Sequence, residues 1–156
     1  MTIVKDVTLF LDQDQIRMNI AQAKYHSKIN LLNTYEQVQI ESKDIWKMAF
    51  TTIYGTYISQ VMQQGDCNAS VTFQHLMTMI FKNHPGHFVY IYLDNIFIYS
   101  DTLEDHEQHL QIIFEILKTA DFFLKQEKCD LYAEKLNYLG HIIDHKGVHA
   151  DRDKIS

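Results

Sequence analysis

Apolar and polar positions along the chain follow two different periods, which predicts helices interleaved with strands. Helical spacing of apolar residues appears over residues 11–24, from Asn68 to about Lys82, and after a capping box at Thr102. Strand-like segments lie between them, most clearly in residues 88–100, "FVYIYLDNIFIYS". Because helices and strands alternate while neighbouring strands form hairpins, we predict an α+β fold in which helices back an antiparallel sheet.

Three hairpins are predicted from turn signals. Gly55 separates "WKMAFTTIY" from "TYISQVM", and the pair Asp94-Asn95 divides the apolar run of residues 88–100. Near the end of the chain, "LNYLGHII" reads as one strand, followed by a turn at Lys146-Gly147 and a short return strand. The sequence contains no Gly/Ser-rich or Pro-rich linker, so we expect residues 1–156 to form a single domain.

Composition and charge narrow the function classes. The formal net charge is −6, and only Arg17 and Arg152 carry guanidinium groups. Nucleic-acid binders usually show a basic stripe, so we expect only weak, salt-sensitive binding of RNA or DNA. We expect an intracellular protein, cytoplasmic or nuclear, because Cys67 and Cys129 are far apart in the sequence and no secretory pattern is present. We also expect no membrane span, because the sequence has no long apolar run.

A series of motifs follows in order over nearly the whole chain. It comprises "AKYHSKINLLNTYEQVQI", "VMQQGDCNASVTFQHLM", "YLDNIFIYS" with "TLEDHEQHL", "EKC", "YLGHII" and "KGVHADRDKI". In this order and spacing the motifs resemble the reverse transcriptase of gypsy-type LTR retrotransposons. The resemblance implies a polymerase palm with part of the fingers over residues 1–156, without the thumb or the ribonuclease H domain. It also implies the family activity, RNA-directed DNA polymerase.

The resemblance places Asn30, Asp94 and Asn95 where the family has three catalytic aspartates. Those aspartates hold two Mg²⁺ ions that activate the primer hydroxyl and carry the triphosphate. Only Asp94 retains a carboxylate here. The side-chain oxygen of an asparagine still ligates a metal ion. The two lost carboxylates, however, no longer supply the negative charge that offsets the cost of gathering two divalent ions in one site. We therefore predict a degenerate site in which Asp94 is the remaining catalytic and metal-binding residue.

The same resemblance predicts a nucleotide pocket at Tyr35, Gln64 and Gly65. Tyr35 matches an aromatic residue that stacks under the incoming sugar, and Gln64-Gly65 matches the loop that contacts the nucleotide. Asp66 and Ser70 depart from the family, in which an apolar residue and a proline are usual at these positions. Both departures argue against tight nucleotide binding.

Two functions of different classes are compatible with this pattern. One is an active RNA-directed DNA polymerase fragment that uses two Mg²⁺ ions. The other, which the degenerate site favours, is a catalytically inactive domain of retrotransposon origin, retained or domesticated as a binding or assembly module. Separation from neighbouring domains would expose apolar surface, so we predict self-association. The aromatic residues of the 88–99 segment are predicted to be core rather than a base-stacking platform.

Overall fold

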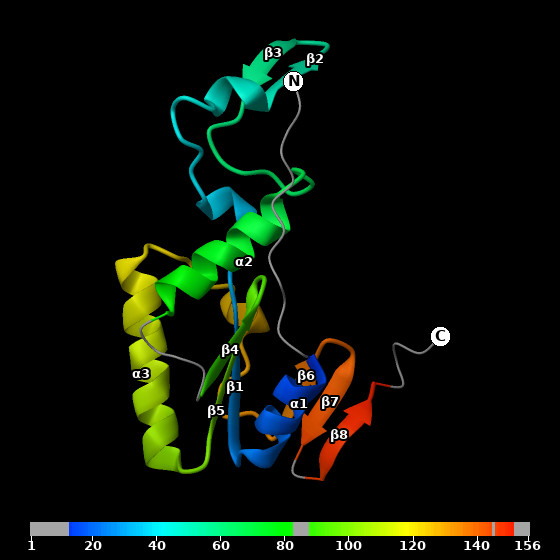
Figure 1. Cartoon of the computed structure of the whole chain (residues 1–156), viewed down its shortest axis with the longest axis vertical. Helices are drawn as coiled ribbons and strands as arrows, with labels where there is room; N and C mark the ends of the chain where they lie inside the picture. The colour runs from blue at the N-terminus through cyan, green and yellow to red at the C-terminus, as the bar shows by residue number, and fades with distance from the viewer. Residues whose placement is uncertain (1–12, 83–87, 145, 152–156) are drawn as a thin grey trace.

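A three-stranded antiparallel sheet forms the centre of the domain (Figure 1). The computed structural model describes residues 13–82, 88–144 and 146–151. The central strands are β1 (Tyr25–Asn30), β4 (Val89–Tyr92) and β5 (Asn95–Ser100), in the order β1-β5-β4. Because β5 pairs with both neighbours, Asn95 lies opposite Asn30 on one side and Tyr92 on the other. One end of the sheet thus carries both asparagines.

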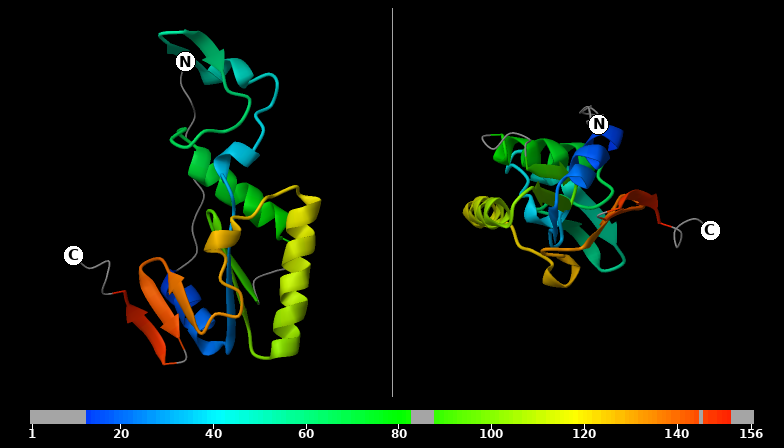
Figure 2. Two further views of the ribbon diagram at one scale, coloured as in Figure 1. Left: turned by 180° about the vertical axis from the view of Figure 1, so that it is seen from behind. Right: turned by 90° about the horizontal axis from the view of Figure 1, so that it is seen from below.

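Alternate side chains of this sheet enter two separate cores. Ile96 and Ile98 pack with helices α2 (Ala69–Ile80) and α3 (Leu103–Thr119), whereas Phe97 between them packs with α1 (Gln13–Gln22). This period of two is the ordinary consequence of strand geometry. Figures 1 and 2 show the two larger helices and the C-terminal strands on opposite sides of the sheet. Tyr90 and Phe97 of the 88–99 segment are buried, as predicted for core residues, and Phe88, Tyr92 and Tyr99 are partly buried against the two cores.

All three predicted helices are confirmed. Helix α3 begins after Thr102, whose hydroxyl accepts the backbone N–H of Asp105 at 3.1 Å, as a capping box requires. Helix α2 follows Asn68 and ends at Ile80. Helix α1 occupies residues 13–22 of the predicted 11–24 segment, and residues 11 and 12 lie outside the described ranges. Within those ranges, no helix has both the length and the apolar character that a bilayer crossing requires.

Three strands that follow η3 (Gln126–Lys128) in the chain form a second antiparallel sheet: β6 (Lys135–Tyr138), β7 (His141–Asp144) and β8 (Gly147–Ala150). The prediction of one long strand over "LNYLGHII" was wrong. Leu139 and Gly140 both have positive φ, +46° and +81°, and turn the chain between β6 and β7. Gly140 accommodates that backbone conformation without the steric cost of a Cβ atom.

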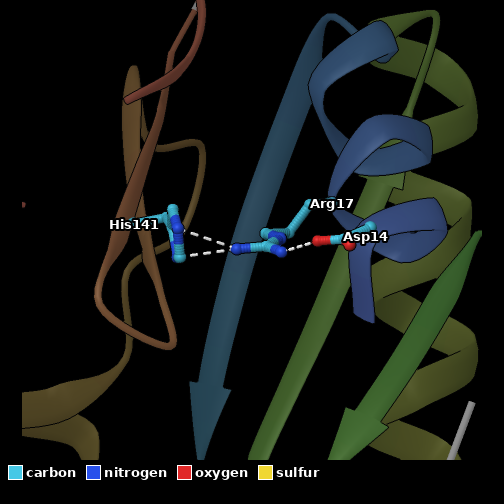
Figure 3. A network of polar contacts seen from close by, with 3 residues as sticks. All are labelled: Asp14, Arg17 and His141. Atoms are coloured by element: carbon cyan, nitrogen blue, oxygen red, sulfur yellow. Dashed lines mark hydrogen bonds and ion pairs between the residues drawn. The ribbon is translucent and has the colours of Figure 1, made fainter. Parts of the chain in front are cut away.

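A polar contact ties this second sheet to α1 (Figure 3). The Arg17 guanidinium donates to the His141 ring, with Nη1 2.7 Å from Nε2, and forms an ion pair with Asp14. Beside it, Tyr138 is fully buried, and burial raises the pKa of its hydroxyl. The contact between α1 and β7 therefore combines buried apolar side chains with the hydrogen bond between Arg17 and His141.

The hairpin of β2 (Ala49–Thr52) and β3 (Gly55–Ile58) extends away from the central sheet (Figure 1). The predicted hairpin is confirmed, although its turn consists of Ile53-Tyr54 and Gly55 begins the second strand. Every strand residue of this hairpin is exposed. The described residues also include three short 3₁₀ helices: η1 (Tyr35–Gln37), η2 (Ile45–Met48) and η3 (Gln126–Lys128).

Two histidines of α3 are held by serines of the central sheet. His106, fully buried, contacts Ser27 Oγ through Nε2 at 2.7 Å and Ser100 Oγ through Nδ1 at 2.9 Å. His109 Nδ1 shares Ser100 Oγ at 2.7 Å. Burial lowers the pKa of His106 to about 4, so its ring is neutral near pH 7. These histidines join α3 to strands β1 and β5.

Candidate functional site

The hairpin between β4 and β5 turns at Leu93 and Asp94. The prediction of an Asp94-Asn95 turn was wrong by one residue, because Asn95 already pairs with Tyr92 as the first residue of β5. Leu93 has φ +53°, a left-handed conformation that is uncommon for a residue with a branched side chain. Asp94 is placed at the very tip, and its carbonyl oxygen accepts Leu31 N–H at 2.9 Å.

The side chain of Gln74 holds this turn from below. Its Nε2 donates to the Ile91 carbonyl oxygen at 2.9 Å, and its Oε1 accepts the Leu93 backbone N–H, also at 2.9 Å. Gln74 belongs to α2 and is only 8% exposed, so water does not readily replace these bonds. A single buried amide therefore stabilises the left-handed residue beside Asp94.

Asn30, Asp94 and Asn95 form one hydrogen-bonded cluster. The Asn30 amide nitrogen donates to Asp94 Oδ2 at 3.2 Å and to Asn95 Oδ1 at 3.1 Å. The Asn95 amide nitrogen donates to Asp94 Oδ1 at 3.0 Å. Both oxygens of the one carboxylate thus accept an amide N–H, which compensates a partly buried charge without a cation. The structure brings together all three residues predicted at the degenerate metal site.

A cleft of about 280 Å³ opens beside this cluster. Its lining consists of the cluster residues Asn30 and Asp94, together with Leu31, Asn33, Thr34, Tyr35, Gln64, Lys125 and Lys128. Tyr35 and Gln64 were predicted for the nucleotide pocket, and both lie in the same cleft as Asp94. Gly65 is next to Gln64 in the chain but does not line the cleft.

The loop around Gly65 is closed by its own side chains. The Asp66 carboxylate accepts the backbone N–H of Gln63 at 2.8 Å, and Gly65 adopts φ +97° within the turn.

The Tyr35 ring packs edge-on against Phe73 with centroids 5.9 Å apart, and its hydroxyl lies 3.2 Å from Ser70 Oγ. Ser70, the residue at the expected proline position, therefore orients the predicted sugar-contacting ring.

A family model described as "Reverse transcriptase (RNA-dependent DNA polymerase)" matches residues 2–143. The chain belongs to the reverse transcriptase family. Similar curated proteins are the retrovirus-related Pol polyproteins from transposon 297 and transposon gypsy of Drosophila melanogaster. They are 31% and 29% identical over 92% and 90% of this chain. The chain spans about 14% of the length of each, and it is thus a reverse transcriptase-like domain of retrotransposon or retroviral origin.

Solved structures of foamy viral protease-reverse transcriptase share the fold. One, in complex with double-stranded DNA, aligns with a TM-score of 0.87 at 25% identity over 97% of this chain and 26% of that chain. Another, in complex with an RNA/DNA hybrid, aligns with a TM-score of 0.82 at 26% identity over 91% of this chain and 19% of that chain. The α+β fold predicted from the sequence, with its antiparallel sheet backed by helices, is confirmed.

The donor set of this reverse transcriptase domain does not fit the pair of Mg²⁺ ions that its family uses. The cluster offers one carboxylate, and both of its oxygens already accept amide N–H groups. In the part of the chain that the structure describes, no three His, Cys, Asp or Glu side chains gather in a way that would hold a metal ion. Hard cations of this kind need several oxygen ligands with matching negative charge.

Sequence reasoning missed three residues around the site of this reverse transcriptase domain. Gln74 was read only as part of a helix, although a polar residue beside the apolar face of Phe73 and Met77 is a signal for a buried amide. Lys128 is the last residue of η3, and Lys125 is the residue before η3. A backbone hydrogen bond from Lys125 N to Asn30 O at 2.8 Å attaches this segment to β1. No local sequence pattern predicts this contact between residues 125 and 30.

Proposed function

We propose that this chain is a reverse transcriptase palm with part of the fingers that no longer catalyses DNA synthesis and serves as a binding or assembly module. The observation that supports the proposal is the single carboxylate of Asp94, each oxygen of which accepts an amide N–H. Asn30 and Asn95 each donate an N–H to Asp94, where a metal-dependent polymerase needs oxygens directed at cations. The chain aligns with a foamy viral protease-reverse transcriptase at a TM-score of 0.87 over 97% of its length, so the proposed loss concerns charge and not fold.

An exchange experiment tests the loss of catalysis. The matching segment of the transposon 297 Pol polyprotein is replaced by residues 1–156, and primer extension on an RNA template is measured with Mg²⁺. We expect synthesis to fall at least about a thousandfold, because the transition state loses several kcal/mol of metal stabilisation. The same chimera carrying Asn30→Asp and Asn95→Asp controls for correct assembly. Robust synthesis by the chimera without these changes would refute the proposal.

Nucleic-acid binding by the chain is proposed to be weak. The foamy viral relatives are described in complex with double-stranded DNA and with an RNA/DNA hybrid. This chain has a net charge of −6, and Arg17, one of its two arginines, is engaged with Asp14 and His141. Acidic side chains outnumber lysine and arginine by 20 to 14, so the net field of the chain opposes binding of a phosphate backbone.

Self-association is proposed to involve the exposed hairpin of β2 and β3. Large apolar side chains gather on this hairpin and on η2 before it, at exposed fractions from 50% to 92%: Trp46, Phe50, Ile53, Tyr54, Tyr57 and Ile58. A two-stranded sheet with exposed faces is marginally stable alone and has two unpaired edges. A second copy of the chain would cover these rings and extend the strand pairing.

One sample tests both binding proposals. Light scattering over a series of protein concentrations is expected to show an apparent molar mass that rises with concentration. Ile53→Lys with Tyr54→Lys is expected to abolish this rise.

Addition of a labelled RNA/DNA duplex at physiological salt should change the fluorescence anisotropy of the duplex little at micromolar protein. A monomer at high concentration would contradict the self-association, and submicromolar duplex affinity would contradict the weak binding.

A further inference from the structure

A continuous chain of polar contacts runs through the interface between α3 and the central sheet. Its centre is Ser100 Oγ, which lies 2.9 Å from His106 Nδ1 and 2.7 Å from His109 Nδ1. The second ring nitrogen of His106, Nε2, lies 2.7 Å from Ser27 Oγ, which also accepts the Tyr132 backbone N–H at 3.0 Å. Ser27 and His106 have no exposed surface and Ser100 is 5% exposed, so water does not compete for these contacts.

The shared serine limits how many protons the two histidines hold together. A serine hydroxyl has one hydrogen to donate, and a neutral imidazole has one N–H donor and one acceptor nitrogen. With both rings neutral, one Nδ1–H donates to Ser100 Oγ and the Ser100 hydrogen goes to the other Nδ1, so each contact is a hydrogen bond. With both rings cationic, two N–H groups are directed at the same oxygen, and the Ser100 hydrogen loses its acceptor. Ser100 therefore bridges these rings only while at most one of them is charged.

The surroundings of His106 oppose a positive charge on its ring. Two aromatic rings flank it, Tyr25 with centroids 6.2 Å apart and Tyr132 with centroids 5.3 Å apart. His26 of β1 is a further titratable group that acts on it, and the Nε2 atom of His26 lies 2.6 Å from the Ile20 carbonyl oxygen. Among the described residues, none forms an ion pair with His106. A proton on His106 would thus be a buried charge without a counter-ion.

His109 lies in a different environment, at the wall of a cleft between the end of α1 and the start of α3. The cleft has a volume of about 360 Å³, and Tyr99, Asp101 and Asp105 also line it. The His109 ring stacks on Phe88, with centroids 3.9 Å apart and planes 7° apart. Burial lowers the pKa of His109, whereas the Asp105 carboxylate raises it. Acid therefore protonates the half-buried His109 before the fully buried His106.

We propose that Ser100, His106 and His109 form a pH switch that releases the first half of α3 from the central sheet in acid. The first proton, on His109, sets one direction of hydrogen bonding: His109 donates to Ser100, Ser100 donates to His106, and His106 donates to Ser27. The second proton, on His106, has no such arrangement, so both rings leave Ser100. Because Ser100 is the last residue of β5 and Asn95 is the first, the switch lies at the opposite end of the strand from Asp94 and does not depend on the proposed loss of catalysis.

The direction of the pH dependence follows from His106. Burial, together with charge on His109 and His26, lowers its pKa from 6.5 to about 4 in the docked helix. A released ring regains the ordinary value, so docking is fully stable above pH 6.5 and loses stability as the pH falls toward 4. The ratio of released to docked helix should rise by about tenfold for each pH unit within this window.

Amide hydrogen exchange of the full chain, measured by NMR from pH 7 to 4.5 and corrected for the intrinsic effect of pH on exchange, tests the switch. We expect protection at Leu110 and Ile113, the buried residues of α3 next to the two histidines, to fall by about thirtyfold between pH 6.5 and 4.5. Leu136 and Ile143 of the second sheet should keep their protection. Equal loss in the second sheet and in α3 would mean that acid unfolds the whole domain, and the proposal would be wrong.

Two variants separate the histidine pair from other acid effects. His106→Gln keeps a neutral donor and acceptor for the serines but does not titrate, so protection of α3 should no longer depend on pH. His75→Gln removes an exposed histidine of α2 and should leave the pH response unchanged. If the loss of protection persists in His106→Gln, the switch does not exist.

Ring ¹⁵N shifts of the unaltered chain give a second measurement that does not require His106→Gln to fold. We expect His109 to titrate before His106, and α3 to lose protection only as His106 titrates. A cationic His106 in a helix that stays fully protected would overturn the proposal.

Discussion

Replacing Asn30 and Asn95 by aspartate is expected to make the stability of the domain depend on divalent cations. The double variant places three carboxylates where two amide N–H groups now bind Asp94, so hydrogen bonds become like-charge contacts. In EDTA we expect the free energy of unfolding to fall by about 2–4 kcal/mol. Added Mg²⁺ or Mn²⁺ should restore about 2.7 kcal/mol when present at a hundred times its dissociation constant. Urea denaturation with and without metal measures both effects.

The unaltered chain should show little response to the same metals, because its carboxylate is already compensated by amides. A charge-matched control, Asn19→Asp with Gln108→Glu, changes two exposed positions away from the cluster and should be insensitive to metal. If Mg²⁺ stabilised the unaltered chain as much as the double variant, the amide cluster would not be the cause of the poor metal fit.

Replacing Gln74 by methionine is expected to destabilise the domain and loosen the Asp94 turn. The variant keeps the volume and helix propensity of the side chain but leaves the Ile91 carbonyl and the Leu93 N–H without their partner. We expect a loss of about 2–3 kcal/mol in the free energy of unfolding, from two hydrogen bonds in a poorly solvated place. Amide hydrogen exchange at Leu93 should also accelerate, which a general loss of core packing would not produce selectively.

Gln108→Met on the exposed side of α3 is the control for this substitution, since it changes the same residue type without a buried partner. It should alter stability by less than about 0.5 kcal/mol. Unchanged exchange at Leu93 in the Gln74 variant would mean that the turn is held by the sheet register alone.

The sequence predicted the elements of the fold better than their turns. The helical periods of 68–82 and 102–117 and the alternation of 88–100 were strong enough to place α2, α3 and the central hairpin. The turn was misplaced because Asp-Asn is a favourable turn pair locally, whereas the structure uses Leu93. Pairing of β5 with β1 and the Gln74 contact override that local preference, and both are tertiary effects.

The candidate site was predicted by residue type but not by the direction of its hydrogen bonds. The positions of Asn30, Asp94 and Asn95 followed from the motif order, and the structure brings them together. That both amides donate toward Asp94 depends on side-chain geometry, which the sequence does not encode locally. The lysines of the cleft were missed because η3 reaches β1 through a contact between residues 125 and 30.

The pairing of Asn30 with Asn95 across β1 and β5 also determines where carboxylates would lie if both residues were aspartates. The strand ladder, rather than the side chains, determines where these two positions lie. A single base change converts either asparagine codon into an aspartate codon. Under the proposed loss of catalysis, the main chain therefore keeps both positions opposite each other, and the two carboxylates could be introduced one codon at a time.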